Sequence, residues 1–327
     1  MKVRFSKYPS IRHFKEIVKE VEEKANYLPI DNNGYTVDYS KPLPVMEFTG
    51  TEKLHGTNSA IAFNSIGGFW LQSRNRIITL DNDNAGFCFW AHSNSTIIDT
   101  LIEKINLEEG YCYIYGEWCG GNIQSGVALN KLPKQFVIFG VKTVTDEVET
   151  WMPSNKVSTV FKGILPTVFD LETYSVIIDF NNPQEAVDKM ENITNKVEEV
   201  SPFALNQGVS GIGEGVVWQC NSYMFKVKGS KHSVSKTNKL IPIYPEKAND
   251  LKDLIDIIVT QNRLHQGLCF LSENNMPNSA ENFKSFLMYI KDDCIKEEMD
   301  TIIASGLTLK DVISAICRKA KSFYFNG

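Results

Sequence analysis

The spacing of the apolar residues changes character at Pro242 and Pro245. Between about Val45 and Val144, and again near 215–228, short β-branched or aromatic runs are separated by turn residues, which is typical of antiparallel strands. Beyond the two prolines, apolar residues recur at helical spacing. We therefore predict an α+β fold, with antiparallel sheets flanked by helices in a domain at 1–242 and a small all-helical domain at 246–327.

The same patterns predict individual elements. Strands are expected at 59–63, 69–73, 111–118, 135–142, 215–220 and 223–228, and helices near 96–105 and 183–200. In the second domain, helical spacing covers 251–259, 283–290 after a Ser279 cap, and 312–323 after a capping box of Thr308 with Asp311. A first helix is expected to start at Ser10, and 27–44, rich in Asn, Asp, Gly and Pro, is predicted to be a loop.

Composition narrows the class of protein. The 327 residues suggest two domains, and 43% apolar content is enough for real cores. No apolar run approaches the ~18 residues that span a bilayer. The seven cysteines include no Cys-x-x-Cys pair, so we expect reduced thiols in a cytoplasmic protein instead of a disulfide or zinc framework. The basic first fifteen residues leave a transit peptide open, although a helix explains their apolar spacing better. A monomer is the default.

One short run carries most of the chemical information. Thr51-Glu52-Lys53-Leu54-His55-Gly56-Thr57-Asn58 puts a lysine between a carboxylate and a histidine, followed by a glycine that lets backbone approach a ligand. A lysine amine has an ordinary pKa of ~10.4, so it needs neighbouring charge and partial desolvation to attack an electrophile such as a nucleotide phosphorus. Lys-x-His-Gly alone is short enough to arise by chance.

A second cluster lies near residue 226. The net charge is −5, yet 221–245 holds five lysines and His232 with no acidic residue. Lys226 and Lys228 are two residues apart in a predicted strand, so their ammonium groups share one face, with Phe225 and Val227 on the other. Two adjacent cations favour an anion such as phosphate between them, although a solvent-facing Lys-x-Lys would have the same spacing.

Four further side chains have both a functional and an ordinary explanation. Arg74, at a strand end, could hold phosphate oxygens, or be a surface charge. Glu117, beside a glycine, could accept hydrogen bonds from ribose hydroxyls, or belong to a turn. Phe139 could stack on a purine base, or be a core aromatic. Glu214, just before an apolar strand, could help to hold a divalent cation. No Walker loop, Ser-His-Asp pattern or zinc spacing occurs.

In this order, the residues resemble the covalent nucleotidyltransferases, which comprise ATP-dependent DNA ligases, RNA ligases and mRNA capping enzymes. Glu52-Lys53-x-His55-Gly56-x-Asn58 is similar to the RNA ligase 2 family, which includes a phage RNA ligase and the trypanosome RNA-editing ligases. DNA ligases and capping enzymes typically carry aspartate where His55 stands. The resemblance covers roughly 5–235, with Lys7-Tyr8 similar to the family's opening, and the helical tail is similar in kind to the phage-type C-terminal domain.

The resemblance implies an adenylation domain that uses ATP and Mg²⁺ or Mn²⁺ to join 3′-hydroxyl and 5′-phosphate ends of RNA, with nicks in duplex RNA as the expected target. Lys53 would form the lysyl-AMP. The other implied roles are adenosine and phosphate contacts from Glu52, Arg74 and Glu117, stacking on adenine by Phe139, phosphate binding by Lys226 and Lys228, metal support by Glu214, and shaping of the site by His55 and Asn58. The 226–239 stretch and the helical tail are the candidate RNA surface.

Two departures and two alternatives remain. Gly140 stands where the family often has an acidic residue, and the segment between Tyr8 and Lys53 is longer than in the phage-type enzyme, so 27–44 is predicted to be an added loop. A capping guanylyltransferase or DNA ligase is one alternative, but His55 and the absence of an all-β C-terminal pattern argue against it. A catalytically silent RNA-binding protein is the other, and the presence of Lys53 argues against it.

Overall fold

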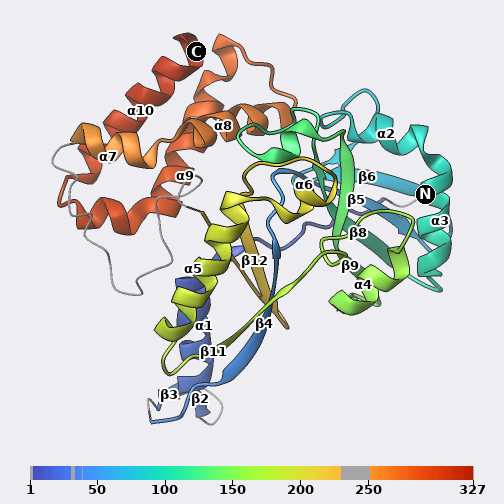
Figure 1. Cartoon of the computed structure of the whole chain (residues 1–327), viewed down its shortest axis with the longest axis horizontal. Helices are drawn as coiled ribbons and strands as arrows, with labels where there is room; N and C mark the ends of the chain where they lie inside the picture. The colour runs from blue at the N-terminus through green and yellow to red at the C-terminus, as the bar shows by residue number, and fades with distance from the viewer. Residues whose placement is uncertain (1–2, 31–33, 39, 230–250, 327) are drawn as a thin grey trace.

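The structure, a computed structural model, describes residues 3–30, 34–38, 40–229 and 251–326. It is a mixed α+β fold in which antiparallel sheets flanked by helices lie beside a helical C-terminal region (Figure 1). Among the described residues, no helix is long and apolar enough to cross a membrane. The predicted fold class is therefore confirmed, whereas the predicted domain boundary at 242–246 lies outside the described residues.

A six-stranded antiparallel sheet has the order β10-β9-β8-β5-β6-β7. Its strands are β5 (Gly56–Asn64), β6 (Phe69–Ser73), β7 (Ile77–Ile78), β8 (Tyr111–Cys119), β9 (Gln135–Thr145) and β10 (Val148–Trp151). Helices α2 (Phe87–Ser93), α3 (Ser95–Ile105) and α4 (Ser154–Phe161) share an apolar core with this sheet. The four strands predicted in this segment are present, most of them longer than predicted, and so is the helix predicted near 96–105.

A five-stranded sheet has the order β1-β13-β12-β4-β11. Its strands are β1 (Arg12–His13), β4 (Val45–Glu52), β11 (Tyr174–Asp179), β12 (Gly215–Cys220) and β13 (Tyr223–Lys228), and only the β1–β13 pair is parallel. Helices α1 (Phe14–Asn26) and α5 (Gln184–Glu199) pack against it around buried Phe48, Trp218 and Phe225. Shorter helices η1 (Ala128–Lys131) and α6 (Pro202–Asn206) share a smaller core with Leu54.

The two sheets are joined directly by the run around Lys53. Strand β4 ends at Glu52 in the five-stranded sheet, and β5 begins at Gly56 in the six-stranded sheet. Residues 53–55 therefore cross from one sheet to the other. Because a crossing segment is anchored at both ends by strand pairing, its side chains are held in fixed positions between the sheets.

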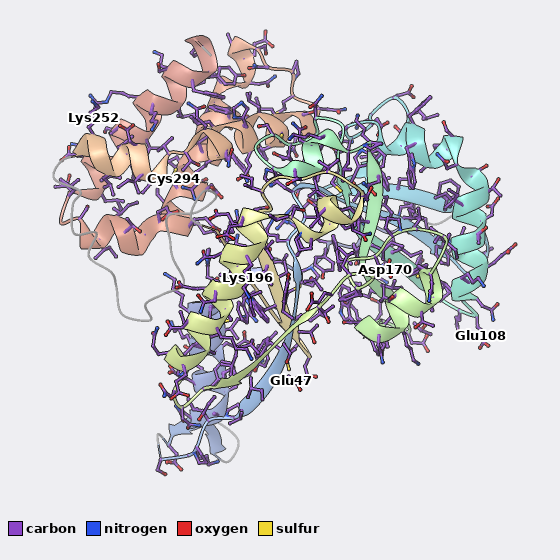
Figure 2. All side chains as sticks on the ribbon, in the orientation of Figure 1. Glu47, Glu108, Asp170, Lys196, Lys252 and Cys294 are labelled. Carbon is purple, nitrogen blue, oxygen red and sulfur yellow. The ribbon has the colours of Figure 1, made fainter. Side chains whose placement is uncertain are left out.

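The C-terminal region forms its own core. It contains α7 (Leu251–Ile258), α8 (Gln261–Glu273), η2 (Ala280–Asn282), α9 (Phe283–Ala304) and α10 (Leu309–Asn326), which pack around residues such as Cys294, labelled in Figure 2. The Thr308 hydroxyl accepts from the Asp311 backbone amide at 3.3 Å, which confirms that cap. The Ser279 prediction was wrong for α9, because η2 intervenes and Asn282 precedes the helix.

Two predictions in the first 44 residues were wrong. The first helix begins at Phe14, not Ser10, because Arg12 and His13 pair with Phe225 and Lys226 at the edge of the five-stranded sheet. The predicted loop at 27–44 contains an antiparallel pair, β2 (Tyr27–Ile30) and β3 (Gly34–Val37). Each of these strands has only four residues, so the turn-forming residues around them dominate the sequence pattern.

Candidate active site

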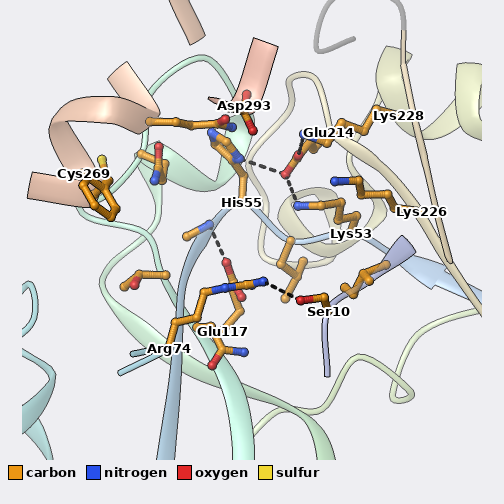
Figure 3. Close-up of a pocket in the computed structure, with 18 of the residues that line it drawn as sticks. Ser10, Lys53, His55, Arg74, Glu117, Glu214, Lys226, Lys228, Cys269 and Asp293 are labelled. Carbon is orange, nitrogen blue, oxygen red and sulfur yellow. Dashed lines mark hydrogen bonds and ion pairs between the residues drawn. The ribbon is translucent and has the colours of Figure 1, made fainter. Parts of the chain in front are cut away.

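Lys53 lies in the segment that connects the two sheets, and it lines a cavity. Its backbone amide donates to the Gly215 carbonyl at 2.8 Å, which continues the pairing of β4 with β12 for one residue beyond the strand. Its Nζ lies 2.6 Å from Oε2 of Glu214, with 19% of the side chain exposed (Figure 3). The ammonium group is thus fixed in position and still reachable from the cavity that it lines.

Glu214 is the carboxylate on which the cationic groups converge. It is 1% exposed, and its Oε2 also lies 2.8 Å from Nδ1 of His55, while its Oε1 lies 3.2 Å from Nζ of Lys228. Burial alone would raise its pKa, but Lys53, Lys228 and His55 hold the pKa well below its usual range. Glu214 is therefore an ionised, buried anchor that orients three side chains of the conspicuous sequence motifs.

The carboxylate beside Lys53 in the sequence does not pair with it. Adjacent residues of an extended chain point to opposite sides, so Glu52 faces α6 while Lys53 faces Glu214. The Glu52 carboxylate accepts from the Ser201 hydroxyl and from the Phe203 amide at 2.7 Å. Burial raises its pKa to about 7, against the opposing effect of these two hydrogen bonds. Glu52 still lines the cavity, but both of its oxygens are engaged at the helix start.

Lys226 and Lys228 project from one face of β13, as their spacing predicted. Phe225 and Val227 alternate with them and are buried in the apolar core. Burial, reinforced by repulsion from Lys228, lowers the pKa of Lys226 to about 8. For Lys228, burial acts in the same direction, but attraction to Glu214 outweighs it and raises the pKa. The two neighbouring lysines are therefore electrostatically different.

The opposite wall of the cavity comes from the six-stranded sheet. Glu117 lies on β8, directly across from Asn58 on β5, and its Oε1 accepts from the Gly56 amide at 2.9 Å. Burial raises the pKa of Glu117 to about 7, although Lys53 opposes this shift. The exposed Arg74 lies at the cavity edge, 3.5 Å from the Ser10 hydroxyl (Figure 3). Asn58 also lines the cavity.

Gly56 has a structural explanation that differs from the predicted one. A Cβ atom at this position would collide with the carbonyl oxygen of Trp118 and lie 2.8 Å from the Cβ of Cys119. The glycine therefore permits close pairing of β5 with β8. Backbone approach to a ligand was the expectation from sequence, whereas the observed close approach is to the neighbouring strand.

Phe139 is a partly buried aromatic that lines the cavity. Its ring lies edge-on to Tyr8, with centroids 4.7 Å apart, and Met224 and Val217 line the same cavity from the other sheet. An aromatic face with aliphatic residues on the opposite wall can hold a flat base by stacking and dispersion. The ring is therefore available to a ligand and is not simply a core residue.

The helical region completes the cavity, and sequence reasoning missed most of these contacts. Arg76 donates from Nε to the carbonyl oxygen of Glu273 at 2.6 Å, and Thr57 donates to the Glu273 carboxylate at 2.5 Å. On another side, Glu297 of α9 lies 3.2 Å from Lys226 and 2.9 Å from His13. The cavity volume is about 800 Å³, which lies within the ~300–1,000 Å³ range of small-molecule sites.

A divalent cation fits the chemistry of Glu214, although the described residues include no group of three or more His, Cys, Asp or Glu placed to hold one. Oε1 of Glu214 is buried and accepts no hydrogen bond from any described residue, despite its ion pair with Lys228. Mg²⁺ commonly takes one or two carboxylates and completes its shell with phosphate oxygens and water. Glu214, a single carboxylate beside the lysines expected to bind phosphate, is consistent with this mode of Mg²⁺ binding.

The family model for RNA ligase matches residues 46–238, which include Lys53, Glu214, Lys226 and Lys228. The chain belongs to the RNA ligase family. The comparison with curated proteins finds no match. The family model thus covers the part of the chain that carries Lys53 and the two lysines of β13.

Solved structures of an RNA ligase from Naegleria gruberi are also similar. The structure with PPi shares 17% identity at a TM-score of 0.45, covering 69% of this chain and 56% of that one. A mutant with ATP and Mn shares 16% identity at 0.46 with the same coverage, and another shares 14% at 0.47, covering 72% and 58%. This RNA ligase family member therefore spans less than two thirds of those chains.

Proposed function

We propose that this chain is an ATP-dependent RNA ligase that seals 3′-hydroxyl and 5′-phosphate ends through lysyl-AMP and RNA-adenylate intermediates. The observation that carries the proposal is the convergence of Lys53, Lys226 and Lys228 on one cavity, with Glu214 fixing two of them (Figure 3). A primary amine beside two phosphate-attracting cations is what nucleotidyl transfer to lysine requires.

In the first step, the Lys53 nitrogen attacks the α-phosphorus of ATP. A P–N bond forms, the nitrogen gives up its proton, and the P–O bond to the β-phosphate breaks, so that pyrophosphate leaves with the electron pair. Negative charge accumulates on the departing oxygens, and Lys226 and Lys228 lie on the face of β13 that can receive it. A divalent cation supported by Glu214 would supply further neutralisation of that charge.

The remaining steps reuse the same groups. An oxygen of the RNA 5′-phosphate attacks the phosphorus of lysyl-AMP, and Lys53 leaves as an amine that takes up a proton. The RNA 3′-hydroxyl then attacks the activated 5′-phosphate, forms the phosphodiester, and releases AMP. This sequence needs positioning and charge stabilisation more than acid–base catalysis, which suits a cavity built mainly from Lys, Arg and Glu.

Recognition of the adenosine falls to the opposite wall. Phe139 offers its ring for stacking, and Glu117, on the same sheet, offers a carboxylate to ribose hydroxyls. Arg74 at the edge can donate to phosphate oxygens, and His55 and Asn58 shape the floor between Lys53 and Glu117. Glu52 supports this arrangement from behind by tying the end of β4 to α6.

The proposed substrate is RNA, with nicks in duplex RNA as the natural target and a monomer in the cytoplasm as the acting form. A-form duplexes are recognised through shape and 2′-hydroxyls. The helical region is a candidate for part of this surface, and residues 230–239 of the lysine-rich stretch lie outside the described residues. Loss of nick binding and sealing on deletion of 246–327 would support this assignment, and unchanged binding and sealing would contradict it.

The deciding experiment is intact-protein mass after incubation with ATP and magnesium. We expect an increment of one AMP on the parent protein and none on Lys53→Ala. Lys319→Ala is the matched control, because it removes a lysine paired with Asp256 in the helical region. Labelling by GTP but not ATP, or no labelling of a parent protein shown to be free of bound AMP, would overturn the proposal.

A further inference from the structure

Glu297 is a carboxylate from the helical region that reaches the lysines of the sheet. Its Oε1 lies 3.2 Å from Nζ of Lys226, and its Oε2 lies 2.9 Å from Nε2 of His13. Only 10% of the Glu297 side chain is exposed. Burial would raise its pKa, but His13 and Lys226 hold the pKa below its usual range. An ionised carboxylate thus lies between two side-chain nitrogens.

His13 and Lys226 are neighbours because their strands are paired. His13 on β1 stands directly opposite Lys226 on β13 in the parallel pair, so both side chains can meet a single anion. Lys226 is one of the two lysines expected to bind phosphate, and Ser10 and Ile11, just before His13, line the same cavity. Glu297 places one oxygen on each donor, as two oxygens of a phosphoryl group would.

We propose that His13 and Lys226 form a subsite for a phosphoryl group, and that Glu297 is its built-in substitute, which the ligand's phosphate displaces. The proposal deepens the proposed ligase function and rests on it for the identity of the ligand. Two phosphoryl sources fit this chemistry: the terminal phosphates of ATP, and the 5′-phosphate of RNA. His13 is then a phosphate-binding residue, and the face of α9 that carries Glu297 competes with the substrate.

A second attachment lets Glu297 leave without detaching the helical region. The end of α8 is held by three hydrogen bonds, each with at least one uncharged partner. Arg76 donates to the Glu273 carbonyl at 2.6 Å and to Asn275 Oδ1 at 3.2 Å. Thr57 donates to the Glu273 side chain. Among the described residues, the hydrogen bonds of Arg76 and Thr57 do not involve Glu297. In addition, α9 departs from helical geometry at Glu298, where φ is −122° and ψ is 16°, immediately after Glu297. The clasp at Glu297 and the attachment at α8 are therefore separate.

Opposite effects of two substitutions test the proposal. In a Lys53→Ala background, which prevents covalent transfer, Glu297→Gln removes the competitor, and His13→Ala removes a donor. We expect Glu297→Gln to tighten binding of the phosphoryl ligand about tenfold, because apparent affinity equals the intrinsic affinity multiplied by the fraction of time the subsite is free, and a competitor in place for about nine tenths of the time lowers it about tenfold. His13→Ala should weaken binding of the same ligand. Asp256→Asn, which removes the Lys319 ion pair elsewhere in the helical region, should change neither.

The choice of ligands separates the two sources. Calorimetric titration with ATP and with AMP isolates the terminal phosphates, and titration with 5′-phosphorylated and 5′-hydroxyl RNA isolates the RNA end. An effect on ATP but not AMP supports the first source, and an effect confined to 5′-phosphorylated RNA supports the second. If both substitutions shift affinity in the same direction, or neither shifts it for any ligand, the triad is only a structural ion pair and the proposal is overturned.

Separate controls test whether a variant is folded and whether the ligase activity is present. Thermal unfolding identifies a variant that has lost its fold, and Glu297→Asp, which keeps the charge but retracts it by one methylene, should then show the same tightening to a smaller degree. Because the titrations use the Lys53→Ala background, they are independent of adenylylation. Failure of the parent protein to accept AMP would refute the ligase proposal while leaving the phosphate contrast measurable.

Discussion

Replacing Glu214 by glutamine should destabilise the protein more than an ordinary site substitution. The carboxylate is 1% exposed and lies within 3.2 Å of Lys53, His55 and Lys228, so Glu214→Gln leaves three groups beside a neutral amide. Breaking a buried ion pair by removing one partner costs about 3–5 kcal/mol. The Lys53 and Lys228 side chains retain 19% and 16% exposure and recover some hydration, so we expect about 2–3 kcal/mol at pH 7.

The effect should depend on pH in a defined direction. The pKa of Glu214 is depressed in the folded protein, so its contribution is present above the unfolded-state pKa and is lost as pH falls through the folded value. Urea unfolding of parent and Glu214→Gln should therefore differ most near neutrality, and the gap should narrow below about pH 4.5. The double variant with Lys228→Met should be less destabilised than the sum of the two single variants.

Equal stability of parent and Glu214→Gln at pH 7 would refute the reasoning, because it would show that the lysines find other partners at no cost. A gap that stays constant from pH 7 to pH 3.5 would refute the electrostatic explanation, while leaving a packing effect. Asp256→Asn is the control, since it removes a carboxylate from an exposed pair and should have little effect on stability.

Three further outcomes follow from the geometry. Glu52→Gln should become more stable than the parent as pH rises from about 5 to 8, by up to about 3 kcal/mol in urea unfolding, because a raised folded pKa means that the parent loses stability over that window; a gap that does not change with pH would contradict this. Phe139→Ala, in a variant shown by thermal unfolding to remain folded, should raise the ATP concentration for half-maximal adenylylation about tenfold or more, since stacking contributes about 1–3 kcal/mol; an unchanged ATP requirement would exclude stacking. Arg76→Ala removes hydrogen bonds to Glu273 and Asn275, so limited proteolysis should cleave between the sheets and the helical region faster than in the parent, and an equal rate would show that other contacts hold the region.

Local patterns predicted the parts of the fold and site that depend on neighbours in sequence. The strands at 215–220 and 223–228 have the predicted bounds, because the first is a short apolar run, the second alternates, and turn residues bound both. Lys226 and Lys228 share a face for the same reason. The motif around Lys53 could be located because its residue types are unusual together.

Partners supplied from distant parts of the chain could not be predicted. The carboxylate that pairs with Lys53 is Glu214, 161 positions away, whereas the adjacent Glu52 faces α6. His13 is placed by the short parallel pairing of β1 with β13, and Glu297 is brought to it by a helix of another region. Neither arrangement leaves a periodic pattern of apolar residues in the sequence. The two-residue strand β1 was absorbed into a predicted helix because Ile11, just before it, continues the helical spacing of Phe14 and Val18.

The two lysines of β13 show how a phosphate site can remain stable without its ligand. Adjacent ammonium groups repel, and each needs an anion when phosphate is absent. Lys228 has Glu214, fixed just before the neighbouring strand β12, and its pKa is raised. Lys226 has Glu297, carried on a helix of another region, and burial with repulsion from Lys228 still lowers its pKa to about 8. Glu214 is held by Lys53 and His55 as well as by Lys228, whereas Glu297 lies on a helix of another region, so Lys226 is the lysine better suited to exchange its carboxylate for a phosphate.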